Sequence, residues 1–366
     1  MPSPYATKLA EGFSQKLIKM IYETSPIEEI INRDYEGEIT AVGSKLNILT
    51  ISRLLEKTYT GANLTPDDLT EINAQLTIDQ FKSFYWREKT LDKFKSYIKE
   101  PKSTVLEQTA NERRKNMMKF VCGFWNKVAA GNWYGTDYTT GTVTITNTTG
   151  AVVGSGTTFT SAMVGQPFQA VGHTKWYRVG TFTDTTHITI VNDTDDDVAG
   201  YDGGDIAGGT AYVLQAATVK TIDNSTTKFL DMLAYLSQKL DEAEVPSEGR
   251  YILIPPAGET SLIKDPSIKL NVPAAYEGLV VKGMVTELQG FKVFKVNRLP
   301  GDNTNGYHVL AGQTNFLTFA DKALNVGMEE DLIGNFGSAY KDLFVYGAKV
   351  TDERRKFGAT AFVKFS

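Results

Sequence analysis

An acidic run near the middle of the chain is the first candidate for a binding site. The stretch NDTDDDVAGYDGGD places carboxylates at alternate positions, Asp193, Asp195 and Asp197, and three such side chains could converge on a calcium ion. The stretch lacks the glycine at position six and the distal glutamate of an EF-hand loop. Two interpretations stay open, a weak calcium site or a solvated acidic loop, and the second is favoured.

Histidine and serine residues add no further site. His173, His187 and His308 are spread along the chain, and none has a cysteine or carboxylate partner at the spacing of a metal site. We expect each to be a structural or exposed residue. Ser261 lies in GETSL, which lacks the Gly-x-Ser-x-Gly pattern of a nucleophile elbow and is more typical of a helix start.

The one cysteine of the chain, Cys122, lies in an apolar stretch beside Val121 and Phe124. A single cysteine excludes a disulfide within the chain, and an apolar setting favours a core residue over a nucleophile. Because no set of residues assembles an active site, we expect no enzymatic activity and no cofactor.

The charge balance limits the classes of partner. The 366 residues carry 38 basic and 43 acidic side chains, a net charge of −5. Tight, sequence-independent binding of nucleic acid depends on a basic field that releases counterions, which this balance does not provide. The N-terminus has no leader pattern, and no apolar run approaches the ~18 residues of a membrane span, so the sequence predicts a soluble, cytosolic protein.

Residues 136–213 differ in composition from the chain on either side. They contain 19 Thr and 12 Gly, and the stretches TVTITN, KWYRVGTF and THITIV alternate apolar and polar residues as half-buried strands do. Eight Asp, no Glu and only two cations, Lys175 and Arg178, give the segment a charge of −6. Because helical patterns lie on both sides, we predict an all-β domain inserted at residues 136–215.

Two elements of the N-terminal region need a partner surface. Residues 5–31 have a helical pattern with one narrow apolar stripe, formed by Phe13, Leu17, Met20 and Ile21. Residues 52–86 have turn signals in their middle, at Gly61, Asn63 and Pro66 to Asp68, and are extended on either side. A two-stranded ribbon is marginal alone in water, so we expect it to lean on another chain or domain.

Two helices are predicted beside the inserted domain. A helical pattern at residues 87–100 breaks at Pro101 and restarts at a Thr104-x-x-Glu107 capping box, followed by roughly six turns at ~3.6 residues each. After the insert, a second helix has four apolar residues on one face, Phe229, Leu233, Leu236 and Leu240.

The remaining chain has the pattern of strands. RYILIPP, from Arg250, predicts a buried strand in a mixed α/β layer, and further strands are predicted within 278–301 and 307–320. The C-terminus, from Leu343, is two extended runs joined by a charged turn. The basic clusters NERRKNMMK and DERRKF are most typical of solvated faces or of salt bridges between subunits.

Five segments, in their order along the chain, resemble the major capsid proteins of tailed double-stranded DNA bacteriophages with the Hong Kong 97-type fold. These are NRDYEGEITAVGSKLNI, LTIDQFKSFYW, VPSEGRYILIPP, LQGFKVFKVNRLPG and AYKDLFVYGAKV. The resemblance implies an α+β chain divided into an N-terminal arm at 1–34, an extended loop at 35–87, a spine helix and the start of the peripheral domain at 88–135, the inserted β domain at 136–215, and the remaining peripheral domain, the axial domain and the C-terminal strands at 216–366.

The resemblance also implies a function. The chain would self-assemble into hexamers and pentamers of an icosahedral shell that encloses packaged DNA without specific binding, be assembled in the host cytoplasm, and meet scaffolding, portal and decoration proteins. The expected assembly contacts are Phe13, Leu17, Ile21, Tyr59, Leu64, Arg354 and Arg355. Because a charge of −6 would repel phosphate within a Debye length of ~8 Å, we expect the inserted domain to face outward, as a stabilising or decoration surface.

Some features depart from the family, and alternatives remain. The inserted domain is not part of the basic fold, and no motif identifies Lys45 or Lys57 as the loop lysine that some relatives crosslink, so we expect no crosslink. The first alternative is an encapsulin-like shell protein of a cellular compartment. The second is a β-module adhesin or carbohydrate-binding protein, with Trp176, Tyr177 and Tyr201 as stacking aromatics, although core and strand-face positions explain these residues more simply.

Overall fold

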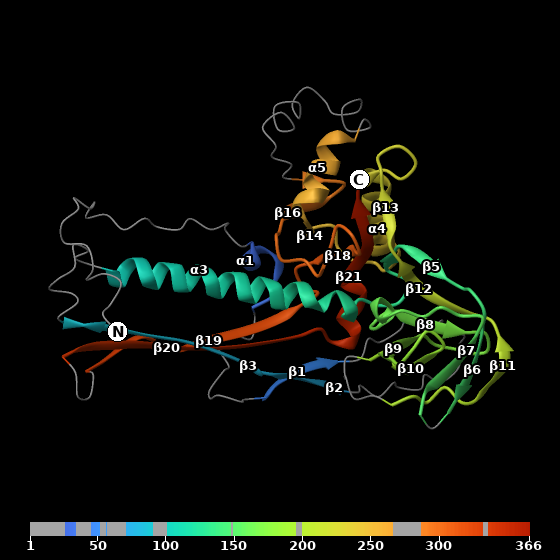
Figure 1. The fold of residues 1–366 in the computed structure, drawn as a ribbon, viewed down its shortest axis with the longest axis horizontal. Helices are drawn as coiled ribbons and strands as arrows, with labels where there is room; N and C mark the ends of the chain where they lie inside the picture. Colours follow the sequence, from blue (N-terminus) through green and yellow to red (C-terminus); the bar gives the residue numbers. More distant parts are fainter. Residues whose placement is uncertain are drawn as a thin grey trace. The chain divides into compact units, whose positions relative to one another are not determined.

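The computed structural model of the protein describes residues 26–33, 45–51, 56, 71–90, 101–147, 149–194, 200–265, 287–331 and 336–366 (Figure 1). The chain divides into two compact units. The first unit takes its described residues from 32–113 and 317–349. The second takes them from 26–31, 114–316 and 350–366.

A three-stranded antiparallel sheet forms the body of the first unit. Its order is β19 (Thr318–Asp331), β20 (Gly337–Lys349) and β3 (Gln80–Lys89). β3 pairs with β20 along its whole length, from Gln80 opposite Tyr346 to Lys89 opposite Gly337. The prediction of a helix from residue 87 is therefore wrong for Arg87–Lys89, because pairing with a strand some 250 residues away overrides the local helical preference.

A two-stranded ribbon is present, but its first strand lies before the predicted range of 52–86. β1 (Lys45–Ile51) pairs antiparallel with β2 (Glu71–Thr77), from Lys45 opposite Thr77 to Ile51 opposite Glu71. The ribbon does not stand alone, because Ile48 and Leu76 pack into one core with Val345 of β20. The turn between the strands lies outside the described residues, and so do Tyr59, Leu64 and Lys57, while only the backbone of Lys45 is described.

The predicted long helix is α3 (Pro101–Cys122), followed by the 3-10 turn η2 (Gly123–Lys127). The helix begins at Pro101 rather than at Thr104, because a proline lacks only an N–H that has no helical partner in the first turn. The side chain of Thr104 is outside the described part of the chain, so the capping box stays a prediction. Within the described ranges, no helix is long and apolar enough to cross a membrane.

Part of the basic cluster NERRKNMMK, on α3, is buried. Arg113 forms an ion pair with Asp342 of β20, and its guanidinium lies 4.3 Å from the centroid of the Phe344 ring. Met117 and Met118, in the second unit, are also buried. The interpretation of NERRKNMMK as a solvated face is therefore wrong for these residues.

Only the end of the predicted N-terminal helix is described, as the four-residue α1 (Ile27–Ile30), in which Ile27 and Ile30 are buried. In the first unit, Asn32 extends the sheet by one residue, since its N–H donates to the Leu317 carbonyl (3.0 Å) and its carbonyl accepts from the Phe319 N–H (2.9 Å). Phe13, Leu17 and Ile21 lie outside the described residues.

A mixed sheet forms the core of the second unit. Its described strands, in order, are β13 (Lys220–Ile222), β21 (Gly358–Phe365), β18 (Gly306–Gln313), β14 (Arg250–Ile254), β16 (Phe291–Lys295) and β15 (Glu287–Leu288), with β17 (Gly301–Asp302) on β18 and β4 (Trp133–Tyr134) on β21. β14 is buried throughout and runs parallel to β16 but antiparallel to β18. This confirms the predicted buried strand in a mixed layer.

Two helices pack on this core. α4 (Phe229–Glu242) buries its predicted apolar face, and burial of each large apolar side chain contributes about 1.5–3 kcal/mol. α5 (Pro256–Lys264) contains Ser261 at its sixth position, where the buried hydroxyl oxygen lies 3.0 Å from Asn224 Nδ2. The prediction that Ser261 starts a helix is wrong, because Pro256, with its preset φ, begins the helix instead.

An all-β body within the second unit spans residues 136–218 and is called the β module below (Figure 1, green to yellow). Its sheet order is β11 (Ile206–Thr210), β6 (Thr142–Thr146), β7 (Ala151–Ser155), β10 (His187–Asn192), β9 (Tyr177–Phe182), β8 (Pro167–Ala170), β12 (Tyr212–Thr218) and β5 (Thr136–Tyr138), with the short η3 (Ser161–Met163) between β7 and β8. It has its own apolar core, which includes Val143, Phe168 and Ile190.

The first and last strands of the β module are neighbours. β5 pairs with β12, with Thr136 opposite Thr218, so the chain enters and leaves the module side by side. The approach is close at Gly135, where a Cβ would lie 2.6 Å from the Ala216 Cβ. The sheet continues three residues past the predicted boundary at residue 215, because β12 runs to Thr218.

Candidate functional site at the end of the long helix

Backbone carbonyls at the end of the α3–η2 helical run accept hydrogen bonds from two arginines that are distant in the sequence. The last carbonyls of a helix have no partner within it and form the negative end of the helix dipole. Here the carbonyls of Asn126, Lys127 and Val128 accept hydrogen bonds from Arg178 of β9 and Arg355 of η4 (Asp352–Phe357). The site therefore satisfies orphan acceptors with permanently charged donors.

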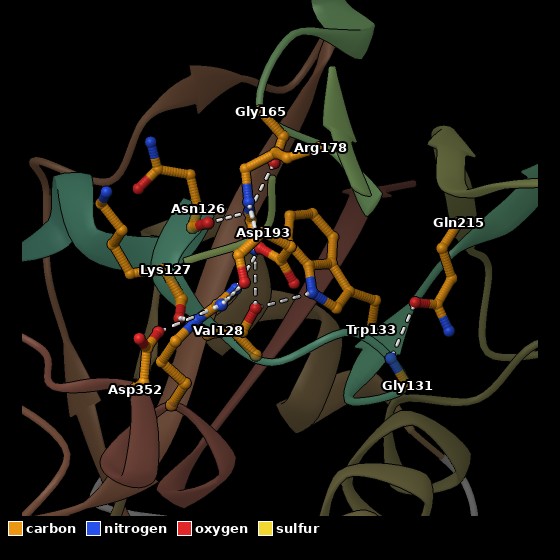
Figure 2. Close-up of polar contacts among 11 residues, drawn as sticks. Asn126, Lys127, Val128, Gly131, Trp133, Gly165, Arg178, Asp193, Gln215 and Asp352 are labelled. Carbon is orange, nitrogen blue, oxygen red and sulfur yellow. Dashed lines mark hydrogen bonds and ion pairs between the residues drawn. The ribbon is translucent and has the colours of Figure 1, made fainter. Parts of the chain in front are cut away.

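Arg178 uses its guanidinium to join the β module to the helix end. Its Nη1 donates to the Asn126 carbonyl and to the Gly165 carbonyl (2.6 Å), and its Nη2 donates to the Val128 carbonyl (3.1 Å) (Figure 2). The guanidinium carbon also lies 5.7 Å from the centroid of the Trp133 ring, within cation–π distance.

Arg355 makes a matching set of contacts from the C-terminal segment. Its Nε donates to the Lys127 carbonyl (3.0 Å), and its Nη1 donates to the Asp193 carbonyl (2.5 Å). Its own carbonyl accepts from the Ala129 N–H (3.1 Å). Asp352 lies 3.7 Å from Arg355 Nη1 and adds an exposed negative charge at the rim.

Asp193 lies between the two guanidiniums. Its Oδ1 atom accepts from Arg178 Nε (2.7 Å) and also pairs with Arg355 Nη2. The three side chains are only 7–10% exposed, and we call them the Asp193 cluster. Such a buried group is stable only when charge and hydrogen bonds are both satisfied, and here one carboxylate, the backbone carbonyls and the exposed Asp352 offset two cations.

The Asp193 cluster corrects two interpretations of the sequence. Asp193 is not a solvated loop residue, and its Oδ1 atom is occupied by two guanidiniums rather than facing a metal site. Asp195 and Asp197 lie outside the described residues. Arg355 is buried within its own subunit, so the solvated interpretation of DERRKF is wrong at this position, while the neighbouring Arg354 is half-buried.

An aromatic stack continues from the Asp193 cluster into the core of the second unit. Trp133, beneath Arg178, meets Trp125 edge to face at 5.6 Å between centroids. Trp125 is stacked on His308 at 3.5 Å, and His308 is stacked on Phe362 at 4.4 Å. Burial lowers the pKa of His308 to about 3, so this histidine is a neutral structural residue.

The aromatic residues of the β module do not form an exposed platform. Tyr177 is buried in the module core, and burial, its largest influence, raises its pKa to about 12. The half-buried Tyr201 donates to the Gly204 carbonyl (2.7 Å) and lies 2.8 Å from His173 Nε2. Trp176 is half-buried as well. The alternative of stacking aromatics for carbohydrate is therefore wrong for Tyr177.

The other candidate residues have structural surroundings. His187 is exposed and pairs with Asp184 at 2.9 Å, and hydrogen bonds to Thr186 and His187 lower the pKa of that carboxyl group. Cys122 is buried, and burial raises the pKa of its thiol to about 12, as expected for a core cysteine. Among the described residues, no group of three His, Cys, Asp or Glu side chains could hold a metal ion.

Sequence reasoning singled out Asp193 and Arg355 but did not bring them together. They are 162 residues apart, and in the sequence the third member, Arg178, is distinguished only as one of two cations in an acidic segment. That rarity was the one available signal. A lone arginine within a strand of an acidic segment suggests a buried ion pair rather than a solvent-exposed charge.

Comparisons with known proteins agree with this architecture. The model of the family described as phage capsid protein matches residues 177–360, just over half of the chain. No curated protein matches the sequence.

Solved structures match over almost the whole chain. One from Mycobacterium phage Che8 has a TM-score of 0.58 at 14% identity and covers 97% of each chain. The capsid structure of the cyanophage P-SCSP1u has a TM-score of 0.56 at 13% identity, covering 98% of this chain and 94% of that one. The capsid of Ralstonia phage GP4 has a TM-score of 0.51 at 10% identity, covering 97% and 94%.

At these identities the structures show a shared fold, which confirms the Hong Kong 97-type fold implied by the sequence. The family model matches at the level of sequence. It covers β9, the strands of the mixed sheet from β13 to β18, and the start of β21. From both findings, the chain belongs to the phage capsid protein family.

Proposed function

We propose that the chain is the major capsid subunit of a tailed bacteriophage and that identical copies assemble into hexamers and pentamers of an icosahedral shell around packaged double-stranded DNA. The observation that carries this proposal is the family match over residues 177–360, supported by a capsid-type fold over nearly the full length. The subunit would assemble in the host cytoplasm, with scaffolding, portal and decoration proteins as further partners.

The net negative charge of the chain is compatible with a shell that encloses DNA without binding it tightly. The net charge is −5, and residues 136–213 alone carry −6. Like charges repel across a Debye length of ~8 Å, so an outward position of the β module avoids facing packaged phosphate. The module would then stabilise capsomers or present a surface to a decoration protein.

The topology of the β module supports its role as an insert in the capsid fold. It enters through β5 and leaves through the adjacent β12, and it has a core of its own. A body attached through two neighbouring strands can be added to a fold without changing the order of the surrounding strands.

Assembly contacts are proposed for the N-terminal arm and the extended loop, with Phe13, Leu17, Ile21, Tyr59 and Leu64 as the residues, and for Arg354 beside η4. Arg355 is a weaker candidate because its guanidinium is used within the subunit. The capsid role is structural, and we propose no enzymatic activity and no covalent crosslink.

Negative-stain electron microscopy of the purified, expressed protein tests this function, with and without a co-expressed scaffolding protein. We expect closed shells with resolved capsomers. Small empty shells of the same size in both preparations would favour a cellular compartment instead. A dispersed monomer in both preparations would contradict the capsid proposal.

A further inference from the structure

Three separate parts of the second unit meet at Asp193. The helix end contributes the carbonyls of 126–128, the β module contributes Arg178 and Asp193, and the C-terminal segment contributes Arg355. Both guanidiniums contact the same carboxylate oxygen, Oδ1, so neither is neutralised independently of the other. Figure 2 shows Arg178 and Asp193 beside the carbonyls of Asn126 and Val128.

The β module does not need this junction to form its own core. Its buried apolar residues form one cluster within 138–217. A further tie to the helix end is the hydrogen bond from the Gly131 N–H to Gln215 Oε1 (2.8 Å). The Asp193 cluster is therefore placed to fix where the module sits rather than whether it folds.

We propose that Asp193 is a conformational lock that holds the β module, the end of the α3–η2 run and the C-terminal segment 350–358 in one arrangement within each subunit. Only when all three are in place are both guanidiniums paired with the carboxylate and with backbone carbonyls. Without the carboxylate, Arg178 and Arg355 are two neighbouring buried cations, and their repulsion separates the module from η4. The lock sets the orientation of the module before any contact with other copies.

Hydrogen exchange of the full-length, unassembled Asp193→Asn chain tests the proposal. The Ala129 N–H, which donates to the Arg355 carbonyl, and the Arg355 N–H, which donates to the Thr351 carbonyl, report on the junction. The Phe159 and Ile190 N–H groups, which donate within the module, report on its core. We expect at least tenfold faster exchange at the two junction amides and unchanged protection at the two core amides.

A matched control is Asp202→Asn, which makes the same change in the same module at an exposed carboxylate paired with Lys175 (2.7 Å). It should leave the junction amides unchanged. If Asp193→Asn does not fold, Arg355→Lys keeps the charge but loses the fork of donors, and the same pattern of exchange is expected.

Two results would overturn the lock. One is unchanged exchange at Ala129 and Arg355 in the variant tested. The other is an equal loss of protection at Phe159 and Ile190, which would mean that Asp193 stabilises the module itself. Because exchange is measured before assembly, the outcome is independent of whether the chain forms shells.

Discussion

The imidazole of His308 lies parallel to the indole of Trp125, with an angle of 12° between the planes and 3.5 Å between the ring centroids. Phe362 covers the opposite face of the same imidazole. Among the described residues, the buried Nδ1 atom of His308 has no hydrogen-bond partner. A proton on this ring would therefore have to be held in an apolar stack.

Acid is expected to destabilise the subunit through His308. Its pKa in the folded state, about 3, is below the usual 6.5, so the unfolded chain binds the proton more tightly. The stabilising contribution is complete above pH 6.5 and is lost as the pH falls toward 3. At pH 5 the loss is about 2 kcal/mol relative to pH 8, at about 1.4 kcal/mol for each pH unit.

Urea unfolding of the unassembled chain at pH 8 and pH 5, compared with His308→Phe, measures this contribution. Phenylalanine keeps a flat ring in the stack but does not titrate, so the variant should lose less stability over the same interval. An equal loss in both proteins would show that His308 is not responsible.

Arg355→Met is expected to lower the free energy of unfolding by about 1–3 kcal/mol, because the buried Lys127 carbonyl loses this donor while Asp193 stays paired with Arg178. Arg354→Met removes the same charge one residue earlier, from a half-buried side chain, and should cost about 1 kcal/mol or less. Denaturation of the two variants in parallel separates the effects. Equal losses would argue against a special role for Arg355.

Gly135→Ala is expected to destabilise the attachment of the β module by about 1–3 kcal/mol, since the new Cβ would lie 2.6 Å from the Ala216 Cβ. Gly123→Ala is the matched control, because a Cβ there meets nothing within 4 Å. That variant should be more stable than the original by about 0.4–1 kcal/mol, through loss of backbone freedom in the unfolded chain. Thermal unfolding of both variants gives the comparison, and a neutral Gly135→Ala would disprove the close contact.

The thiol of Cys122 should be unreactive in the folded chain at pH 8, because it is buried and its pKa is raised to about 12. A chromogenic disulfide reagent should detect no thiol in native protein within minutes and one thiol per chain in denaturant. Rapid reaction of the native protein would place Cys122 at an accessible position.

Local sequence patterns are enough to predict a helix with one apolar face or a strand of consecutive apolar residues. Helix α4 was predicted from Phe229 and three leucines at helical spacing, and β14 from four consecutive apolar residues. Each signal is contained in fewer than fifteen residues. The alternation of apolar and polar residues in the strands of the β module is also a local signal, so it predicts the all-β character of the module but not the order of its strands.

Long-range pairing explains what could not be predicted. Arg87–Lys89 looks helical alone, and only β20 makes it a strand. In the sequence, Arg355 is one of several charges in a basic cluster. Its burial depends on pairing with Asp193, which is 162 residues away. Neither pairing has a local signature, so the site at the helix end became visible only in the structure.

The capsid proposal requires that copies of this chain assemble into a shell. Sedimentation velocity of the purified full-length protein, with and without a co-expressed scaffolding protein, measures this directly, because one chain has a mass of 40.3 kDa. We predict a boundary from particles containing hundreds of chains in at least one preparation. A single species with the mass of one chain in every preparation would contradict assembly into a shell.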